Sequence, residues 1–347
     1  MINLAKLEYR VIVISSDGEQ LDVTGIANGL GWSEGEKELA AKITCKFACV
    51  EVNGKTIDEI IQPMTPIIIY ADIGDGFQEA IRGNVTKLEL TEANNEFVLS
   101  VECADECHAL RHNQEDKYFT DGHSSNAILE DVLKEAGAEY RIEIKDGTHG
   151  KKVYRQKYYS DMIADVLKDL KEKGGGEYFI RAKEGVIEII PRGTNETIYH
   201  FDIDDNVVRV KESFDASKVV TKVKVVGKEK TEGHQSVEAV VEGNTELGTR
   251  QVIYRRKDKE TLAEAEAAAK KLLDENGVQR KTSLEAPDVP FIRKGDKIRV
   301  RSSVGEGFFF IKSIRHDAPQ MKMNLELDTA ESEYETAKTD ESTENAP

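Results

Sequence analysis

Two stretches of the chain, "IIIYADIGDGFQEAIR" at 67–82 and "KIRVRSSVGEGFFFIK" at 297–312, share one pattern. In each, an alternating apolar run enters a Gly-acid-Gly turn, and a second apolar strand follows from a phenylalanine. Glycine readily adopts the positive φ of tight turns, so each stretch predicts a β-hairpin. The repeat predicts two similar β-domains. The candidate interface tips of their hairpins are Gly74, Asp75, Gly76, Gly305, Glu306 and Gly307.

The composition favours a soluble protein of two or three domains. A chain of 347 residues can bury more than one core. Its net charge of -17 disfavours sequence-specific binding to nucleic acid, because neutralising phosphates needs a basic face. No apolar run approaches the roughly 20 residues that cross a bilayer. The first run meets Asp17 and Glu19, so we expect no membrane-spanning segment and synthesis in a cytoplasm.

Residues 1–103 are predicted to form an N-terminal β-barrel domain. Their apolar residues alternate, turn-forming pieces separate the runs, and no helical pattern intervenes. Such a pattern is typical of an antiparallel barrel or sandwich. The expected strands lie at 7–14, 42–50, 66–73, 77–90 and 96–103.

The spacing of the four cysteines predicts free thiols and no metal site. Cys45 and Cys49 lie on one face of a predicted strand, about 13 Å apart, which is too far for a disulfide or a shared ion. Cys103 ends the alternating face of another strand. If 104–111 is a short helix capped near Asp105, Cys107 and His112 lie on different faces and cannot bind one metal ion together. The alternative is a zinc site built from Cys103, Cys107, His108 and His112.

Residues 104–205 are predicted to form an α+β region with a duplicated helix-strand unit. The stretches 124–147 and 159–185 each contain one apolar helical stripe followed by a Glu-Tyr-x-Ile strand. Serines are the expected N-caps and glycines the expected C-terminal stops. The N-caps would be Ser124 or Ser125 and Ser160, and the stops Gly137 and Gly174.

Residues 206–328 are predicted to form a second β-barrel domain with one long helix at 258–277. The packing face of this helix would consist of Leu262, Ala265, Ala269, Leu272 and Leu273, and Gly277 would end it. Lysines alternate with valines at 217–230, which indicates the solvent face of a strand rather than a nucleic-acid patch. Residues 329–347 are acidic, with no aliphatic side chain larger than alanine, and are predicted to be a disordered tail.

No residue is assigned a catalytic, cofactor-binding or metal-binding role. The residues of a nucleophilic triad come from separated segments of the chain. The polar residues at 121–125 are neighbours in sequence, which indicates that they cap a helix instead. The glycine-rich stretches at 29–36 and 171–178 lack phosphate-binding spacing. We expect no carboxylate pair in an apolar setting that would raise a pKa for acid catalysis. The contiguous polar group is Asp121, His123, Ser124 and Ser125.

The order of parts resembles a known family over roughly residues 5–328. The stretches that carry the resemblance are "FTDGHSSNAILEDVLKEAG", "YYSDMIADVLKDL", "ASKVVTKVKVVG" and "IRKGDKIRVRSSVGEGFFFIKSIRH". Together they are similar to the XkdQ-type baseplate hub protein of contractile phage tails and phage-tail-like bacteriocins. Relatives tend to have Tyr-Asp at the exit of the first barrel, where this chain has Ala104-Asp105 and keeps the acid.

The resemblance implies a structural, non-enzymatic protein. Such hubs are homotrimers whose two barrels per chain form a six-barrel ring, which joins a six-fold tail tube to a three-fold spike. The implied partners are the tail tube, spike and baseplate wedge proteins. The implied location is the baseplate of a virion tail or tail-like particle, assembled in the cytoplasm of a bacterial host. An acidic lumen would also suit the passage of DNA, because like charges do not hold the polymer.

Two alternatives come from other functional classes. A tail-associated cell-wall hydrolase is disfavoured because no further segment of domain size is expected once the barrels and the middle region are placed. A carbohydrate-binding tail adhesin would rest on Trp32 and a few tyrosines as sugar-stacking side chains.

Overall fold

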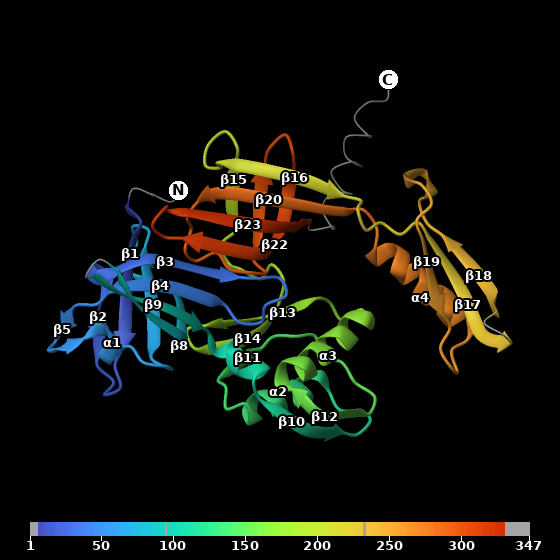
Figure 1. The fold of residues 1–347 in the computed structure, drawn as a ribbon, viewed down its shortest axis with the longest axis horizontal. Helices are drawn as coiled ribbons and strands as arrows, with labels where there is room; N and C mark the ends of the chain where they lie inside the picture. Colours follow the sequence, from blue (N-terminus) through green and yellow to red (C-terminus); the bar gives the residue numbers. More distant parts are fainter. Residues whose placement is uncertain (1–5, 94–95, 232–233, 330–347) are drawn as a thin grey trace. The chain divides into compact units, whose positions relative to one another are not determined.

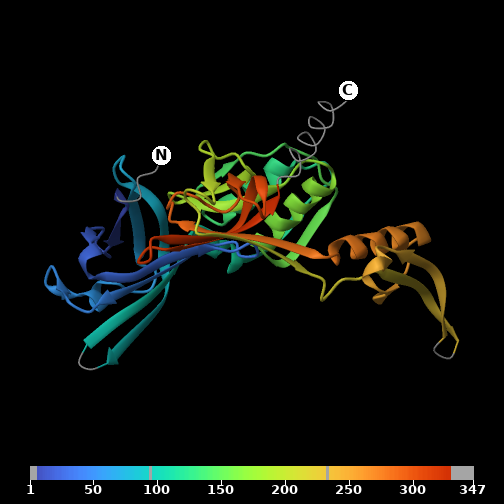
Figure 2. The ribbon, with the colours of Figure 1, turned by 90° about the horizontal axis from the view of Figure 1, so that it is seen from above.

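Alternating apolar residues make this chain mainly β-sheet, with an α+β insertion, as the sequence predicts (Figures 1 and 2). The computed structural model describes residues 6–93, 96–231 and 234–329. The chain divides into two units. Unit 1 runs to Val210 and resumes at Ser283, and unit 2 is Lys211–Thr282.

The N-terminal strand group of unit 1 follows the predicted strands closely. Its antiparallel order is β3-β4-β9-β8-β7-β1-β2. Every second side chain points into one core, which includes Val13, Ile43, Phe47 and Ile69. The elements are β1 (Glu8–Ile14), β2 (Gln20–Asp22), η2 (Thr24–Ile26), β3 (Ala27–Glu34), β4 (Lys42–Ala48), β5 (Glu51–Val52), β6 (Lys55–Thr56), α1 (Ile57–Ile60), β7 (Pro66–Asp72), β8 (Gln78–Ala93) and β9 (Glu96–Ala104).

The C-terminal strand group lies mainly in unit 1 and is continuous with the first group, although residues 211–215 of β16 and 279–282 of β20 fall within unit 2. Its ladder runs β16-β20-β23-β22, with β21 paired to β22 and β15 paired to β21. Strand β22 also pairs with β3, where Ile314 lies opposite Glu34, so both groups belong to one 13-stranded sheet. Closure of each group into a barrel stays a prediction. The elements are β15 (Tyr199–Asp202), β16 (Arg209–Asp215), β20 (Gln279–Pro287), β21 (Lys297–Arg301), β22 (Glu306–Asp317) and β23 (Lys322–Thr329).

The α+β insertion brings the two predicted helix-strand units together. Strand β11 pairs with β14 in parallel and β13 pairs with it antiparallel, so both repeated strands flank β14. Helices α2 and α3 bury their apolar stripes in one shared core. The elements are η3 (Glu106–Arg111), β10 (Gln114–Phe119), α2 (Ser125–Glu135), β11 (Tyr140–Ile142), β12 (Lys152–Tyr158), α3 (Tyr159–Glu172), β13 (Tyr178–Lys183) and β14 (Val186–Pro191).

The predicted helix ends are confirmed except for one cap. The Ser124 hydroxyl accepts a hydrogen bond from the backbone N–H of Ala127 at 3.1 Å and caps α2. Gly137 and Gly174 follow the two helices with φ of 68° and 75°, which favours glycine. The prediction for Ser160 is wrong, because α3 begins one residue earlier and its N-cap is Tyr158, without a side-chain cap.

Unit 2 is a three-stranded sheet with one helix. The strand order is β18-β17-β19, and α4 packs on the sheet through the fully buried Ala265 and Ala269. The prediction that Leu262 packs there is wrong, since 42% of it is exposed at the first turn of α4. The elements are β17 (Lys222–Thr231), β18 (His234–Glu242), η4 (Thr245–Leu247), β19 (Gln251–Arg255) and α4 (Leu262–Glu275). The elements predicted within 206–328 therefore divide between the two units.

All four cysteines are free thiols. Cys45, Cys103 and Cys107, hereafter the buried thiols, lie in the core, while Cys49 is partly exposed. Burial raises the pKa of Cys45 and of Cys103 to about 12. The predicted short helix is the 3-10 helix η3, capped by Asp105.

The described residues contain neither a candidate metal site nor a membrane-spanning helix. No group of three His, Cys, Asp or Glu residues in 6–93, 96–231 and 234–329 is placed to hold a metal ion. Over the same ranges, no helix has the length and apolar content to cross a membrane. The predicted acidic tail begins where β23 ends, and residues 330–347 lie outside the described residues.

Candidate functional site

The first predicted tip, at Gly74, Asp75 and Gly76, lies in the turn between β7 and β8. The last cross-strand pair before the turn is Ala71 with Gln78. The Asp72 carboxylate closes the turn by accepting the backbone N–H of Gly74 at 2.6 Å and of Gly76 at 3.0 Å. Both glycines have positive φ, 117° and 97°, where other residues would be strained.

The second predicted tip is displaced from its expected position. Arg301 pairs with Glu306, so Glu306 and Gly307 are already the first residues of β22. The turn closes earlier because the Ser302 hydroxyl accepts the backbone N–H of Gly305 at 3.1 Å. The equivalence of the two tips is therefore corrected: Gly305 belongs to the turn, whereas the two residues after it belong to the strand. Their role as an interface stays a prediction.

A cation covers the phenylalanine of each hairpin motif. The Arg10 guanidinium carbon lies 3.9 Å from the centroid of the Phe77 ring, and Lys297 Nζ lies 4.3 Å from the centroid of Phe308. Such contacts contribute about 0.5–1 kcal/mol each at exposed sites. Each contact holds a phenylalanine against a side chain of a neighbouring strand, Arg10 of β1 or Lys297 of β21.

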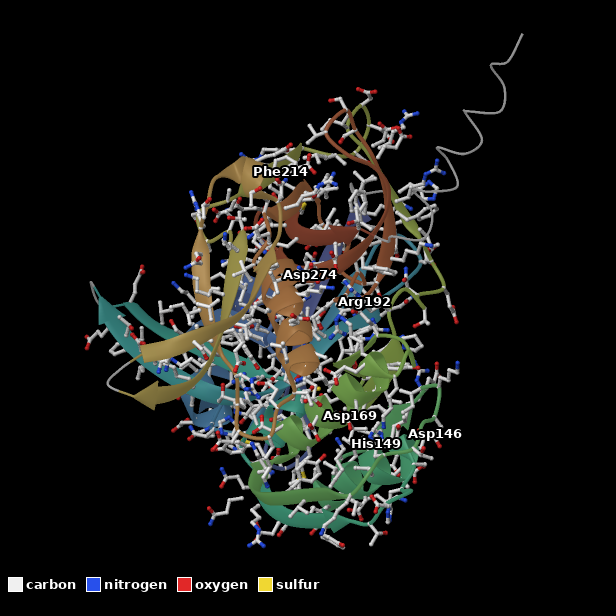
Figure 3. The ribbon with its side chains drawn as sticks, turned by 90° about the vertical axis from the view of Figure 1, so that its right-hand side faces the viewer. Asp146, His149, Asp169, Arg192, Phe214 and Asp274 are labelled. Atoms are coloured by element: carbon white, nitrogen blue, oxygen red, sulfur yellow. The ribbon has the colours of Figure 1, made fainter. Side chains whose placement is uncertain are left out.

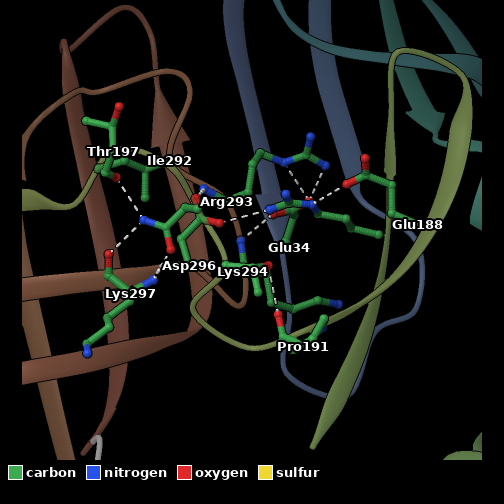
Figure 4. A network of polar contacts seen from close by, with 12 residues as sticks. Glu34, Glu188, Pro191, Thr197, Ile292, Arg293, Lys294, Asp296 and Lys297 are labelled. Carbon is green, nitrogen blue, oxygen red and sulfur yellow. Dashed lines mark hydrogen bonds and ion pairs between the residues drawn. The ribbon is translucent and has the colours of Figure 1, made fainter. Parts of the chain in front are cut away.

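A buried set of charges lies where three parts of unit 1 meet (Figure 4). This charged junction consists of Glu34, Arg181, Glu188, Arg293 and Asp296, contributed by β3, β13, β14 and the segment between β20 and β21. Glu34 accepts from Arg293 Nε at 2.8 Å. Arg181 donates to Asp296 at 2.9 Å and to Glu188 at 3.0 Å. The network ties the N-terminal strands, the insertion and the C-terminal strands together.

The electrostatics of the charged junction are those of a paired structural network. Burial opposes ionisation of Glu34, but Arg293 outweighs it and lowers the pKa of Glu34. Burial likewise opposes the charge of Arg293, and Glu34 nonetheless raises its pKa. Burial raises the pKa of Asp296 despite its contact with Arg181. Each charge therefore depends on its partner, and removing one leaves the other uncompensated.

Two neighbouring acids at the start of η3 are shielded from solvent, Asp105 fully and Glu106 in part. Asp105 is buried and accepts the backbone N–H of Ala41 at 3.0 Å and of Cys107 at 3.1 Å. Burial raises its pKa to about 7 and also raises the pKa of Glu106. The expectation concerned a carboxylate pair in an apolar setting suited to acid catalysis, and it stays a prediction, because charged side chains including Arg293 and Arg82 lie near these two acids. The Asp105 carboxylate joins the end of β9 to the segment before β4.

The strand pairing of β22 with β3 is reinforced by a buried histidine. His316 Nδ1 lies 2.6 Å from an Asp288 oxygen, and the Tyr9 hydroxyl donates to the other Asp288 oxygen at 2.5 Å. The ring of Trp32 stacks on His316 with centroids 4.4 Å apart. Trp32 is only 2% exposed, so it offers no surface for stacking a sugar. Trp32, which together with a few tyrosines would support a carbohydrate-binding adhesin, therefore belongs to the core.

A serine, a histidine and an aspartate do meet in the insertion, although not as the contiguous residues suggested. Ser125 Oγ lies 2.8 Å from His149 Nε2, and His149 Nδ1 lies 3.2 Å from Asp169 (Figure 3 labels the latter two). Ser125 is fully buried, so this arrangement does not present its hydroxyl to a substrate. Burial alone would raise the pKa of Asp169. The contacts of Asp169 with Lys152 and His149 together have the larger effect, so its pKa is lowered. The cluster fastens the segment at 143–151 to α2 and α3.

Asp121, His123 and Ser124 of "DGHSSN" each have a hydrogen-bond partner outside the Ser125, His149 and Asp169 cluster. Asp121 accepts the backbone N–H of Lys151 at 2.6 Å, and His123 Nδ1 lies 2.9 Å from the Thr120 carbonyl. Ser124 caps α2, as the sequence predicts. Sequence reasoning missed His149 and Asp169, because their proximity arises only from folding.

Residues 49–328 match the family described as YQBQ-like. The chain belongs to the YQBQ-like family. The matched part of this YQBQ-like protein includes both hairpin motifs, the insertion and unit 2. No match was found among curated protein sequences.

Solved structures show the same fold as this YQBQ-like protein. The 43 kDa tail protein of prophage MuSo2 from Shewanella oneidensis is 14% identical, with a TM-score of 0.66 over 92% of this chain and 97% of that one. A tail protein from Neisseria meningitidis MC58 is 11% identical, with a TM-score of 0.64 over 93% and 97%. Prophage tail protein gp18 from Listeria monocytogenes EGD-e is 13% identical, with a TM-score of 0.54 over 97% and 100%.

Proposed function

We propose that this YQBQ-like protein is a structural component of a phage tail or tail-like particle. The observation that carries the proposal is its likeness to a prophage tail protein over 92% of this chain and 97% of that one. The fold is thus shared from end to end and not in a single module. An Escherichia coli component of the type VI secretion system, described as similar to phage tail proteins, also shares the fold, with a TM-score of 0.54.

Within such a particle, we assign the chain to the baseplate hub. The hub would be a homotrimer between the tail tube and the central spike, with contacts to wedge proteins. Two strand groups per chain support this, since three copies would present six groups to a six-fold tube while keeping three-fold symmetry toward the spike. The continuous pairing through β22 and β3 would let each chain transmit load between its two groups.

A non-enzymatic role is supported by the burial of the polar clusters and by the hydrogen bonds and ion pairs within them. The charged junction is buried and internally paired, and the Ser125 hydroxyl is enclosed by His149 and the Gly147 carbonyl. Each carboxylate oxygen of Asp105 accepts a hydrogen bond from a backbone N–H group. Each of these groups contributes to rigidity, which a load-bearing connector requires. No observation favours the hydrolase or the adhesin over the hub.

The test is the mass of the purified chain, alone and with its spike and tube proteins, by native mass spectrometry. We expect assemblies containing three copies of the 38.8 kDa chain. Asp75→Lys, at the exposed first tip, should weaken capture by the tube or spike protein. Asp274→Lys makes the same charge change on the exposed side of α4 and should bind as the wild type does. A chain that stays monomeric with both partners present would contradict the hub.

A further inference from the structure

Within the described part of the chain, the sheet of unit 2 has a helix on only one of its faces (Figures 1 and 2). The register places Val223 beside Val241 and Val225 beside Ala239, and these side chains pack toward α4. Tyr254 lies on the same face from β19. Since side chains alternate along a strand, the intervening residues point away from α4.

Apolar side chains gather on the opposite face. Val240 and Ile253 lie either side of Lys224 in one cross-strand row, and Val237 belongs to the next row. Their exposed fractions are 44% for Val240, 60% for Ile253 and 53% for Val237. Single exposed apolar residues are ordinary, but several on one side of a small sheet indicate an interaction surface. This open sheet face consists of Lys222, Lys224, Val237, Val240, Glu242, Ile253 and Arg255.

The charge of the open sheet face is basic, although the whole chain has a net charge of -17. Its one acid, Glu242, is paired with Lys222 at 2.6 Å. Among the described residues, no acid pairs with Lys224 or Arg255. On this face Lys224 lies between the exposed apolar side chains of Val240 and Ile253, and Arg255 lies on the edge strand β19, so the complement of the face is an apolar stripe with acidic side chains beside it.

The area of the open sheet face suits a short helix better than the surface of a whole folded domain. Three strands about 4.8 Å apart and about 17 Å long provide a few hundred Å², well below the roughly 800 Å² per partner of a standard protein interface. A helix of about three turns has the same length and covers such a face. A second copy meeting face to face would bring its own Lys224 and Arg255 against these cations, so self-pairing is disfavoured.

We propose that the open sheet face docks an amphipathic helix with acidic flanks from a partner protein. The helix would form a second layer opposite α4 and bury the exposed valines and isoleucine. This inference goes beyond the structural role proposed above, and it does not depend on the oligomeric state of the chain.

The test uses the full chain and a labelled synthetic peptide of about 18 residues, with leucines on one helical face and glutamates on both flanks. Fluorescence anisotropy should show saturable binding, at least about tenfold tighter than that of the same peptide with lysine flanks. Ile253→Asp should weaken binding by at least about tenfold. Val278→Asp, a similar change at an exposed valine away from this face, should have no effect.

A charge swap keeps the test decisive if Ile253→Asp does not fold. Lys224→Glu should weaken binding of the glutamate peptide and strengthen that of the lysine peptide. The proposal is overturned if neither peptide binds up to about 1 mM, if both bind equally, or if Val278→Asp weakens binding as much as Ile253→Asp. Preferential binding to anionic lipid vesicles would also overturn it. Because no outcome involves the trimer mass, failure here leaves the hub proposal untouched.

Discussion

Replacing Arg293 with methionine removes the cation on which the charged junction depends. The guanidinium contacts Glu34 through Nε at 2.8 Å and the Ala182 carbonyl at 3.0 Å. The Glu34 side chain is 3% exposed, so after the change its buried carboxylate would lose the guanidinium and retain the hydrogen bond from the backbone N–H of Lys294, which is 2.7 Å long in this structure. Methionine occupies a similar volume, so the loss is electrostatic rather than a cavity.

We expect Arg293→Met to lower the free energy of unfolding by about 3–5 kcal/mol, which is typical for breaking a buried ion pair. At roughly 2–4 °C per kcal/mol for a domain of this size, Tm should fall by about 6–20 °C. Arg209→Met is the matched control, since its bond to Glu285 is made by a side chain that is 69% exposed. That change should cost at most about 1 kcal/mol.

The double variant Glu34→Met with Arg293→Met separates charge from packing. Replacing both members of a buried pair with apolar residues is often neutral, so the double variant should recover most of the lost stability. The assay is thermal and urea unfolding followed by circular dichroism. If Arg293→Met costs no more than Arg209→Met, or if the double variant is less stable than the single one, the account of the charged junction is refuted.

Three further predictions follow from the buried groups and the tail. Burial raises the pKa of Asp105 to about 7, above about 3.9 in the unfolded chain, so the folded state binds the extra proton and stability falls as pH rises between these values. As the pH rises from 5 to 8, the free energy of unfolding of Asp105→Asn should therefore increase by about 2–3 kcal/mol relative to that of the wild type. Parallel plots of the free energy of unfolding against pH for the two proteins would contradict this. Ellman's reagent should label Cys49 in the native protein and all four cysteines only after denaturation, and fast native labelling of the buried thiols would be the opposing result. Truncation after Thr329 should leave Tm unchanged, because the tail has no large aliphatic groups to bury, and a large drop would refute that view.

Local signals predicted the insertion well. The stripes of α2 and α3, the Ser124 cap and the glycine stops all act within a few residues, so sequence alone reveals them. The same logic failed for the second hairpin. There the Ser302 hydroxyl accepts the backbone N–H of Gly305, so the turn closes at the first glycine of the Gly-Glu-Gly motif. A short motif fixes the existence of a hairpin more securely than its register.

The division into two units was beyond the reach of sequence patterns. The alternating valines of β17 and the alanine-rich α4 have the same pattern whether they join a barrel or a separate sheet. Which sheet a strand joins depends on pairing between distant residues.

The burial of Glu34 and Asp105 could have been predicted from the alternation of side chains along their strands. Glu34 continues the strand face of Leu30 and Trp32, and Asp105 continues that of Val101 and Cys103. Alternation thus places both carboxylates on the core side. The partner of Glu34 is 259 residues away, and the sequence does not reveal it.

The central claim is that this chain is the hub between tail tube and spike, and a cryo-electron microscopy reconstruction of the particle tests it most directly. We expect three copies in one ring between the tube and the spike, with the six strand groups arranged around the axis and the tip at Asp75 facing a neighbouring protein. Density that places the chain away from the tube-spike axis, or in a copy number other than three, would contradict the account.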